Sequence, residues 1–180
     1  NAVAFQDSNV SVSIGAITVS ENATLNLEDG ANANTQATAI ASIDVDTGKT
    51  LTIVNGVNVD GTTIGDGNVD FTISGTTTGL GTLIIKSEDG TTAAGNDATL
   101  KDTGAISISN FTVKSGDGIT ASLGSTMEVE DLGTASLGIS STNFTMKAGD
   151  GATGAAASRG GILTITQVTA DVSSTNYLIS

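Results

Sequence analysis

The sequence predicts an all-β protein built from stacked strand–turn repeats. Apolar and polar residues alternate with a period of two, which is the period of a strand and not of a helix. Pairs such as Asp-Gly and Asn-Gly, which favour tight turns, interrupt this alternation at short intervals. The phrase NFTVKSGDGIT at residues 110–120 returns as NFTMKAGDGAT at residues 143–153, with eight of eleven positions identical. A recurring strand–turn phrase indicates a recurring structural unit.

Strands are predicted in chain order wherever the alternation is clear. The first covers residues 10–20 and the last covers residues 176–180. The alanine-rich segment 31–41 is the one stretch whose composition also suits a helix. Nine shorter segments show the strand pattern between the two ends: 24–27, 41–45, 50–54, 69–74, 82–86, 98–101, 105–109, 126–130 and 162–168.

The duplicated phrase belongs to a longer repeat. Residues 98–121 align with residues 126–154, and residues 82–93 form a third, partial copy. Residues 24–33 and 42–56 have the character of eroded copies. Successive copies lie roughly 26 to 33 residues apart, which is the length of one supersecondary unit that stacks on its neighbours. We therefore expect one all-β domain over residues 1–180, with residues 21–170 as its repeat region.

Two architectures account for such a repeat. In a β-solenoid each repeat is one coil, and its narrow interior suits Val, Ile, Leu, Ala and Thr better than large rings. The chain has only four Phe and one Tyr, with no Trp, which favours the solenoid. An antiparallel β-sandwich of the kind found in fibre subunits, in which the repeated phrase is a duplicated hairpin, is the alternative.

Composition argues against several functions. Six Lys and Arg stand against nineteen Asp and Glu, so the formal net charge is −13. This charge disfavours nucleic acids and anionic membranes as partners. Without Cys or His, the chain lacks thiolate zinc sites and the usual catalytic triads, and its carboxylates fall mostly in glycine turns. We expect no enzyme activity, and no apolar run reaches the ~18 residues of a membrane-spanning helix.

The turns raise the question of calcium. Three Gly-Asp-Gly turns occur, at residues 65–67, 116–118 and 149–151, and a tight turn is the favoured interpretation. However, Asp66, Asn68 and Asp70 alternate, so their oxygens can share one face as calcium ligands. Asp44 and Asp46 alternate in the same way, and Asp60 is a further carboxylate that can lie near. Neither the stretch with Asp66 nor the stretch with Asp44 completes an EF-hand loop. The sequence predicts no cofactor other than this calcium ion.

Other side chains recur at repeat positions. The lysines of the repeat should form a row beside the acidic turns, with solvated ion pairs across strands or rungs; they are Lys86, Lys114 and Lys147. Phe111 and Phe144 should fill the core. Four Asn residues fit the N-glycosylation pattern, which is also frequent by chance in so Ser- and Thr-rich a chain: Asn9, Asn22, Asn110 and Asn143.

The ends of the sequence are strand-like and contain no Pro. An exposed edge strand without such protection invites pairing with another chain. Residues 3–20 are therefore predicted to be an intersubunit strand, unless they only close the protein's own sheet. The apolar positions on which this prediction depends are Val10, Val12, Ile14, Ile17 and Val19.

Three phrases carry a resemblance to known families. Residues 17–30 (ITVSENATLNLEDG), 43–56 (IDVDTGKTLTIVNG) and 81–90 (GTLIIKSEDG) resemble passenger regions of bacterial autotransporters and filamentous-haemagglutinin-like adhesins. That resemblance implies a right-handed parallel β-helix outside the cell. The composition is also similar to pilin-type subunits of extracellular fibres, in which a terminal strand completes the neighbouring subunit.

These observations lead to one functional prediction and one alternative. The prediction is a secreted structural subunit of an extracellular filament, pilus-like fibre or sheath, which assembles with copies of itself by β-strand addition. The first residue is Asn1 and not Met, which is consistent with a processed, extracellular or cell-surface protein. The alternative is a surface adhesin of the autotransporter type, whose partner is a ligand on a host or neighbouring cell.

Overall fold

The protein is all-β. The computed structural model describes residues 2–5, 12–28, 36–57, 69–90, 98–119, 123–131, 138–151, 159–166 and 171–180, and these contain no helix. The described strands are β1 (Ala2–Phe5), β2 (Val12–Val19), β3 (Ala23–Glu28), β4 (Gln36–Val45), β5 (Thr50–Val57), β6 (Val69–Ile73), β7 (Thr77–Ser87), β8 (Ala98–Thr103), β9 (Ile106–Lys114), β10 (Thr126–Val129), β11 (Ile139–Lys147), β12 (Ile162–Ile165) and β13 (Val172–Ile179).

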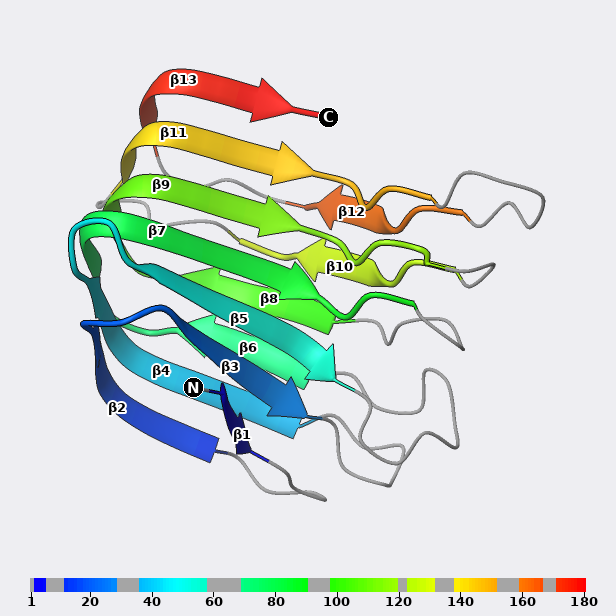
Figure 1. Ribbon diagram of the computed structural model, residues 1–180, viewed down its shortest axis with the longest axis horizontal. Helices are drawn as coiled ribbons and strands as arrows, with labels where there is room; N and C mark the ends of the chain where they lie inside the picture. The colour runs from blue at the N-terminus through cyan, green and yellow to red at the C-terminus, as the bar shows by residue number, and fades with distance from the viewer. Residues whose placement is uncertain are drawn as a thin grey trace.

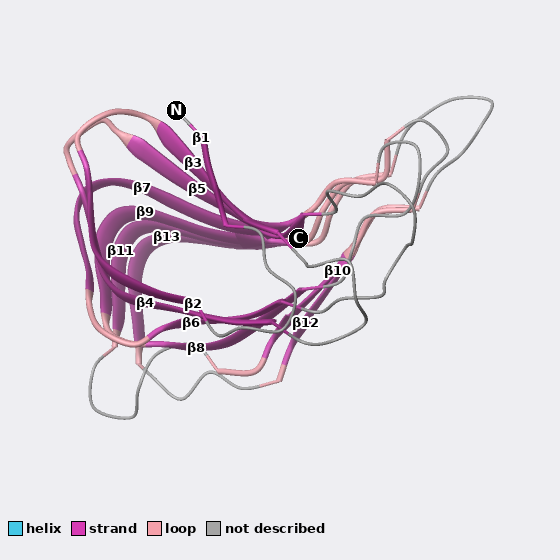
Figure 2. Cartoon of the chain, turned by 90° about the horizontal axis from the view of Figure 1, so that it is seen from below, coloured by secondary structure: helices cyan, strands magenta, loops and turns pink. Residues whose placement is uncertain are grey.

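All the strand pairs of the described residues are parallel, and together they form a solenoid (Figure 1). The odd-numbered strands stack in the order β1, β3, β5, β7, β9, β11, β13. We call this the odd-strand layer. The even-numbered strands stack from β2 to β12 as the even-strand layer. Figure 2, which looks along the stack, shows the two layers facing one another.

A curved side joins the two layers. It consists of the carboxyl-terminal halves of β2 and β4 and the amino-terminal ends of β7, β9, β11 and β13, as Figure 2 shows. Each coil therefore runs through the even-strand layer, the curved side and the odd-strand layer. A parallel stack of this kind confirms the preferred β-solenoid, and the antiparallel sandwich is wrong.

The register explains the duplicated phrase. Asn110 pairs with Asn143 and Phe111 with Phe144, so the two copies occupy the same place in neighbouring coils. The partial copy also stacks as predicted, because Lys86 pairs with Lys114. The repeat exists because each coil must present the same inward and outward pattern to the coil beside it.

The core lies between the two layers. On β7 the buried side chains alternate with partly exposed ones, as the period of two requires, and Leu83 and Ile85 are fully buried. Phe111 and Phe144 stack face to face, with ring centroids 5.4 Å apart, and both rings are buried. The prediction that these two rings fill the core is confirmed. Most of the other buried apolar side chains are Leu, Ile and Val, and the ring of Phe71 and the side chains of Met127 and Met146 are buried with them.

One minor alternative from the sequence is wrong, and one strand was missed. The segment 31–41 is not helical where the structure describes it, because residues 36–41 belong to β4. Stacking on the neighbouring coils overrides the local helix propensity of alanine there. The segment 139–147 was absent from the predicted strands, yet it forms β11. Its apolar alternation is interrupted by four consecutive polar residues, which conceals the period.

Glycine is required where the odd-strand layer ends. A Cβ atom on Gly116 would lie 1.8 Å from the carbonyl oxygen of Glu88, and one on Gly149 would lie 1.9 Å from that of Gly116. These distances are far below any real contact, so the turns of successive coils touch through their backbones. The Gly-Asp-Gly segments at residues 116–118 and 149–151 are thus stacking elements, in which Gly118 and Gly151 form a parallel bridge, and the tight turn with a positive φ that the sequence suggested is not seen there.

Candidate assembly surfaces at the two ends of the stack

The N-terminal end of the stack exposes one edge of β2. Strand β2 pairs with β4 along its other edge, and the described residues place no strand on the exposed edge. Four of the five apolar residues predicted for an intersubunit strand lie on β2: Val12, Ile14, Ile17 and Val19. The fifth, Val10, lies outside the described residues. The position of β2 at an open edge is compatible with the predicted role, which stays a prediction.

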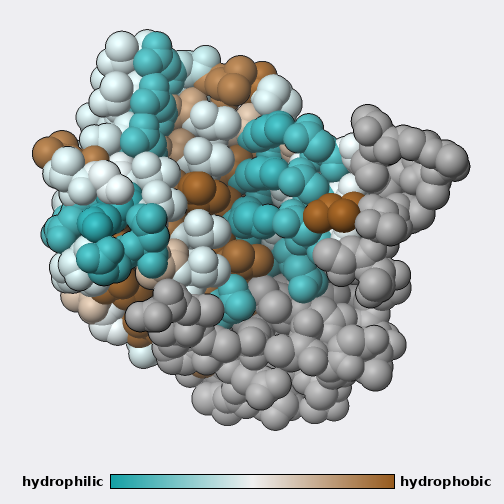
Figure 3. Space-filling view, in the orientation of Figure 1, coloured by the Kyte–Doolittle hydropathy of each residue, from teal (hydrophilic) through white to brown (hydrophobic). Residues whose placement is uncertain are grey.

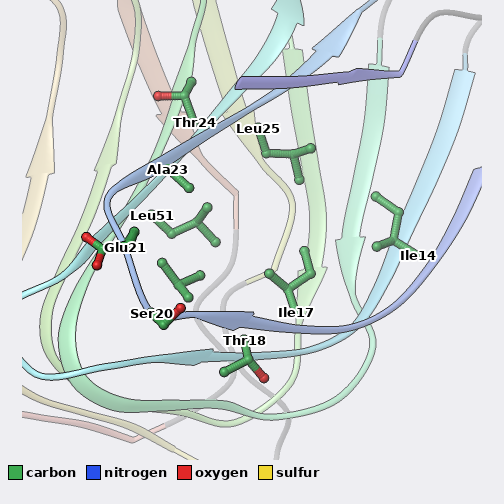
Figure 4. Close-up of a pocket in the computed structure, with 10 residues that line it drawn as sticks. Ile14, Ile17, Thr18, Ser20, Glu21, Ala23, Thr24, Leu25 and Leu51 are labelled. Carbon is green, nitrogen blue, oxygen red and sulfur yellow. The ribbon is translucent and has the colours of Figure 1, made fainter. Parts of the chain in front are cut away.

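An apolar hollow lies behind this edge. It has a volume of about 320 Å³ and opens between β2 and β3 (Figure 4). The side chains of Ile14, Ile17, Leu25 and Leu51 point into it from the two strands and from β5. Ala23 also lines it and contributes only a methyl group. The first coil therefore leaves part of its interior unfilled.

One inward row of the odd-strand layer grows in size along the stack. It begins at the small Ala23 and ends at the aromatic ring of Tyr177. The register joins its members in the order Ala23, Leu51, Leu83, Phe111, Phe144, Tyr177. At the N-terminal end, the small side chain of Ala23 leaves space unfilled in this row. At the C-terminal end, the same row ends in the half-exposed ring of Tyr177.

The C-terminal end exposes apolar side chains on β13. Tyr177 is 52% exposed, Leu178 53% and Ile179 65%. The ring of Tyr177 meets that of Phe144 edge-on, with centroids 5.3 Å apart, and its other side has no aromatic partner in the described residues. Figure 3 shows hydrophobic surface over β13 beside the hydrophilic bands that cross β7, β9 and β11. Strand β13 pairs only with β11 in the described part of the chain.

The strands at both ends lack charge. None of the four terminal strands, β1, β2, β12 and β13, contains Asp, Glu, Lys or Arg. Of the nine described strands between them, all except β5 carry at least one charged residue. Soluble proteins commonly protect open edges with charge, and a chain of net charge −13 has abundant charge to place there.

A column of asparagines runs to the C-terminal end. The Nδ2 of Asn176 donates to Oδ1 of Asn143 at 2.8 Å, and Nδ2 of Asn143 donates to Oδ1 of Asn110 at 2.6 Å. Nδ2 of Asn110 donates to Oγ1 of Thr82 at 3.1 Å. The amides all point the same way, so the column ends with the Oδ1 of Asn176 directed out of the stack. Asn22 begins the same column at the other end, where its Oδ1 accepts from the backbone N–H of Thr50.

The sequence analysis did not identify this column. Its signal was the recurrence of Asn at a constant spacing of 33 residues, from Asn110 to Asn143 to Asn176. Two of these Asn residues, and Asn22, were noted only as N-glycosylation positions. In the structure their side chains make hydrogen bonds between coils, while Asn9 lies outside the described residues.

The lysine row forms beside the acidic turns as predicted, but the ion pairs differ. Each lysine pairs with the Asp three residues later in its own turn and not across rungs. The distances are 2.6 Å for Lys86–Asp89, 2.6 Å for Lys114–Asp117 and 2.5 Å for Lys147–Asp150. The rungs are connected by the other carboxylate oxygens, because Oδ1 of Asp89 accepts from the N–H of Asp117. Oδ1 of Asp117 accepts from the N–H of Asp150 in turn.

These contacts set the charge state of Asp117. Burial is the largest single influence and raises its pKa. The hydrogen bonds from Lys114 and from the backbone of Asp150, with the charges of Lys114 and Lys86, outweigh burial, so the pKa of Asp117 is lowered. The ionised turn therefore stabilises the stack.

The predicted calcium ligands are only partly described. Asp66 and Asn68 lie outside the described residues, as does Asp60. Asp70 lies on β6, and its Oδ2 is 3.6 Å from Nζ of Lys101. Burial raises the pKa of Asp70, as do the charges of Glu130 and Glu128, and together they outweigh Lys101, which lowers it. No three acidic side chains of the described residues gather as a metal site needs. The calcium site stays a prediction.

The other proposed carboxylates have separate surroundings. Oδ1 of Asp44 accepts a hydrogen bond from the hydroxyl of Thr78 at 2.9 Å, and the side chain of Asp46 is exposed.

A comparison with models of known protein families, with curated proteins and with solved structures finds no match. Within the described ranges, no helix is long and apolar enough to cross a membrane.

Proposed function

We propose that the protein is a structural subunit of an extracellular filament, pilus-like fibre or sheath, and that it assembles by parallel strand addition between its two ends. The observation that carries the proposal is the pair of open, uncharged edges at opposite ends of one stack. The C-terminal end of one copy would receive the N-terminal end of the next.

Geometry favours a filament over a closed dimer. The two ends are different surfaces, so their contact is heterologous, and a heterologous contact that does not close continues indefinitely. Parallel strands lie about 4.8 Å apart, and a second copy at that distance from β13 would continue the stacking direction of the coils. The open backbone groups of both ends would then be paired, and the exposed apolar residues of β13 would be covered.

Sedimentation velocity of the purified chain tests the proposal. We expect species larger than the monomer that grow with concentration. The matched variant is Thr18→Pro. The carbonyl of Val19 accepts from the N–H of Asp46, directly after β4, so the main chain of the preceding Thr18 faces the open edge; the side chain of Thr18 is exposed. Proline there removes an edge donor without disturbing the β4 pairing, and this variant should stay monomeric.

A second candidate, the surface adhesin, is favoured by a different observation. A polar groove of about 430 Å³ follows the curved side and is lined mainly by the Ser and Thr residues of β9, β11 and β13. Its hydroxyls could bind a polar ligand of another cell. A chain that remains monomeric at every concentration, yet binds glycans on an array, would support the adhesin and contradict the filament.

A further inference from the structure

The register determines how one copy can follow another. At the N-terminal end, β2 begins the even-strand layer and the curved side, but β1 lies one coil ahead of β3 in the odd-strand layer. A second copy can place β2 against β12 and the amino-terminal part of β13 only if its β3 pairs with the rest of β13. The edge of β3 that this requires is occupied by β1 of the same copy.

We infer that β1 is an exchangeable strand, which the β13 strand of a second copy displaces from β3 when the filament grows. This inference rests on the proposed function and specifies its joint. After the exchange, the first part of β13 pairs with β2 and the second part pairs with β3, while Ile165 at the end of β12 lies opposite Val12. Without the exchange, β1 would meet the second part of β13, and the described residues would offer no strand to its first part.

The apolar row supports the exchange. In the exchanged register Tyr177 would lie opposite Ala23 and Ile179 opposite Leu25, because Tyr177 and Ala23 belong to the same inward row. The hollow beside Ala23 has the volume, about 320 Å³, to accept the half-exposed ring of Tyr177. The smallest member of the row and the largest would thus meet at the joint, as close packing requires.

The polar column supports the same register. Asn176 directs its Oδ1 out of the C-terminal end, and Asn22 begins the column at the N-terminal end. The exchange would bring Asn22 of the second copy opposite Asn176, where its amide can donate to that oxygen as Asn143 donates to Asn110. The column of hydrogen bonds would then continue from one copy into the next.

The pairing lengths favour the incoming strand. Strand β1 is paired with β3 through four residue pairs, whereas β13 is paired with β11 through seven. A strand that pairs along both the curved side and the odd-strand layer gains more backbone hydrogen bonds and apolar contacts than the short strand that it replaces. The edge of β3 must therefore be freed of β1 for this pairing to form.

A reversible lock tests the exchange. Ala2 and Thr24 are directly paired, and the chain contains no Cys, so Ala2→Cys/Thr24→Cys forms a single disulfide that holds β1 on β3. Under oxidising conditions we expect this variant to lose filament formation, and reductant should restore it. The unmodified chain, which has no thiol, should assemble equally with and without reductant. Locked chains that assemble as fast as reduced ones would overturn the exchange.

A second pair of cysteines reports the joint itself. Leu178 and Thr24 face one another in the exchanged register, so Leu178→Cys/Thr24→Cys filaments should oxidise to a ladder of covalent oligomers. If β1 stays in place, Leu178→Cys/Ala2→Cys should give the ladder instead, and the exchange would be wrong. Failure of the unmodified chain to assemble would contradict the filament itself, which separates the two outcomes.

Deletion of residues 1–5 is an independent test of the exchange. If β1 must leave before the joint forms, its removal should lower the critical concentration for assembly about tenfold, which corresponds to about 1.4 kcal/mol. A deletion that abolishes assembly would show that β1 builds the joint and would overturn its role as an exchangeable strand.

Discussion

At the scale of single residues, the stack depends on side chains that repeat one contact from coil to coil. Asp117 is the clearest case, since its carboxylate accepts from Lys114 in its own turn and from the backbone of Asp150 in the next. The stacked rings of Phe111 and Phe144 do the same in the core. The Asp117–Asp150 and Phe111–Phe144 contacts therefore connect neighbouring coils, whereas the Lys114–Asp117 contact stays within one turn.

Acid should weaken the stack through Asp117. Its pKa is lowered in the folded protein, so its stabilisation is present above the ordinary carboxyl pKa of about 4 and is lost as the pH falls through the folded value. Asp117→Asn should lose about 1 to 2 kcal/mol at pH 7. It should also show a smaller decline in the free energy of unfolding on acidification.

Urea unfolding between pH 3 and pH 7 measures both effects. Asp46→Asn is the matched control, because it removes the same charge from an exposed turn position. An Asp117→Asn protein with the unaltered acid dependence would show that the turn contributes nothing to the pH response.

The core prediction concerns Phe111. Its ring is fully buried and stacked on Phe144, so Phe111→Ala should lower the free energy of unfolding by about 3 to 5 kcal/mol through lost burial and a cavity. Phe111→Leu introduces the residue that the preceding coil has at the paired position, Leu83, and should lower the free energy of unfolding much less. Equal losses in the two variants would mean that volume in this row is unimportant.

At the scale of elements, position in the stack decides what a strand needs. Strands between two neighbours have both edges paired and tolerate charge on their outward faces, as β9 does with Lys114. Strands β2 and β13 each have one open edge and no charge. The difference between inner and terminal strands is the basis of the assembly proposal.

Two proline variants of β13 should behave in opposite ways. Ser180 donates to the carbonyl of Met146 and accepts from Ala148, so its main chain faces β11. By alternation Leu178 also faces β11, whereas Ile179 faces the open edge. Ile179→Pro should keep the monomer folded and stop assembly, and Leu178→Pro should in addition release β13.

Circular dichroism and sedimentation together measure these outcomes. Release of β13 should appear as lost strand signal in Leu178→Pro alone. Assembly of Ile179→Pro at the level of the unmodified chain would mean that the open edge of β13 is not the joint.

Much of the fold could be predicted from the sequence, element by element, but less of the candidate assembly surfaces could. The period of two and the repeated phrase are local signals, and they correctly indicated β3, β5 and β9. β11 was missed because four polar residues interrupt its alternation. The hollow beside Ala23 could not be predicted, since it depends on which row Ala23 joins, and that row exists only once the register is known.

At the scale of the whole molecule, the described coils form one stack, and its first and last strands each have an edge that no other described strand occupies. Its interior coils are tied by backbone pairing, the asparagine column and the lysine–aspartate turns. These devices repeat along the axis and have no natural stopping point within the described coils. A structure of this kind is suited to growth along its axis, and its net charge of −13 keeps the sides of neighbouring stacks apart.

Negative-stain microscopy of the purified chain, with and without millimolar calcium, tests the central claim most directly. The account predicts unbranched filaments one molecule wide in both conditions. Filaments only with calcium would assign a ligand role to Asp66, Asn68 and Asp70 and place the metal in the assembly. Separate particles of monomer size in both conditions would contradict end-to-end assembly.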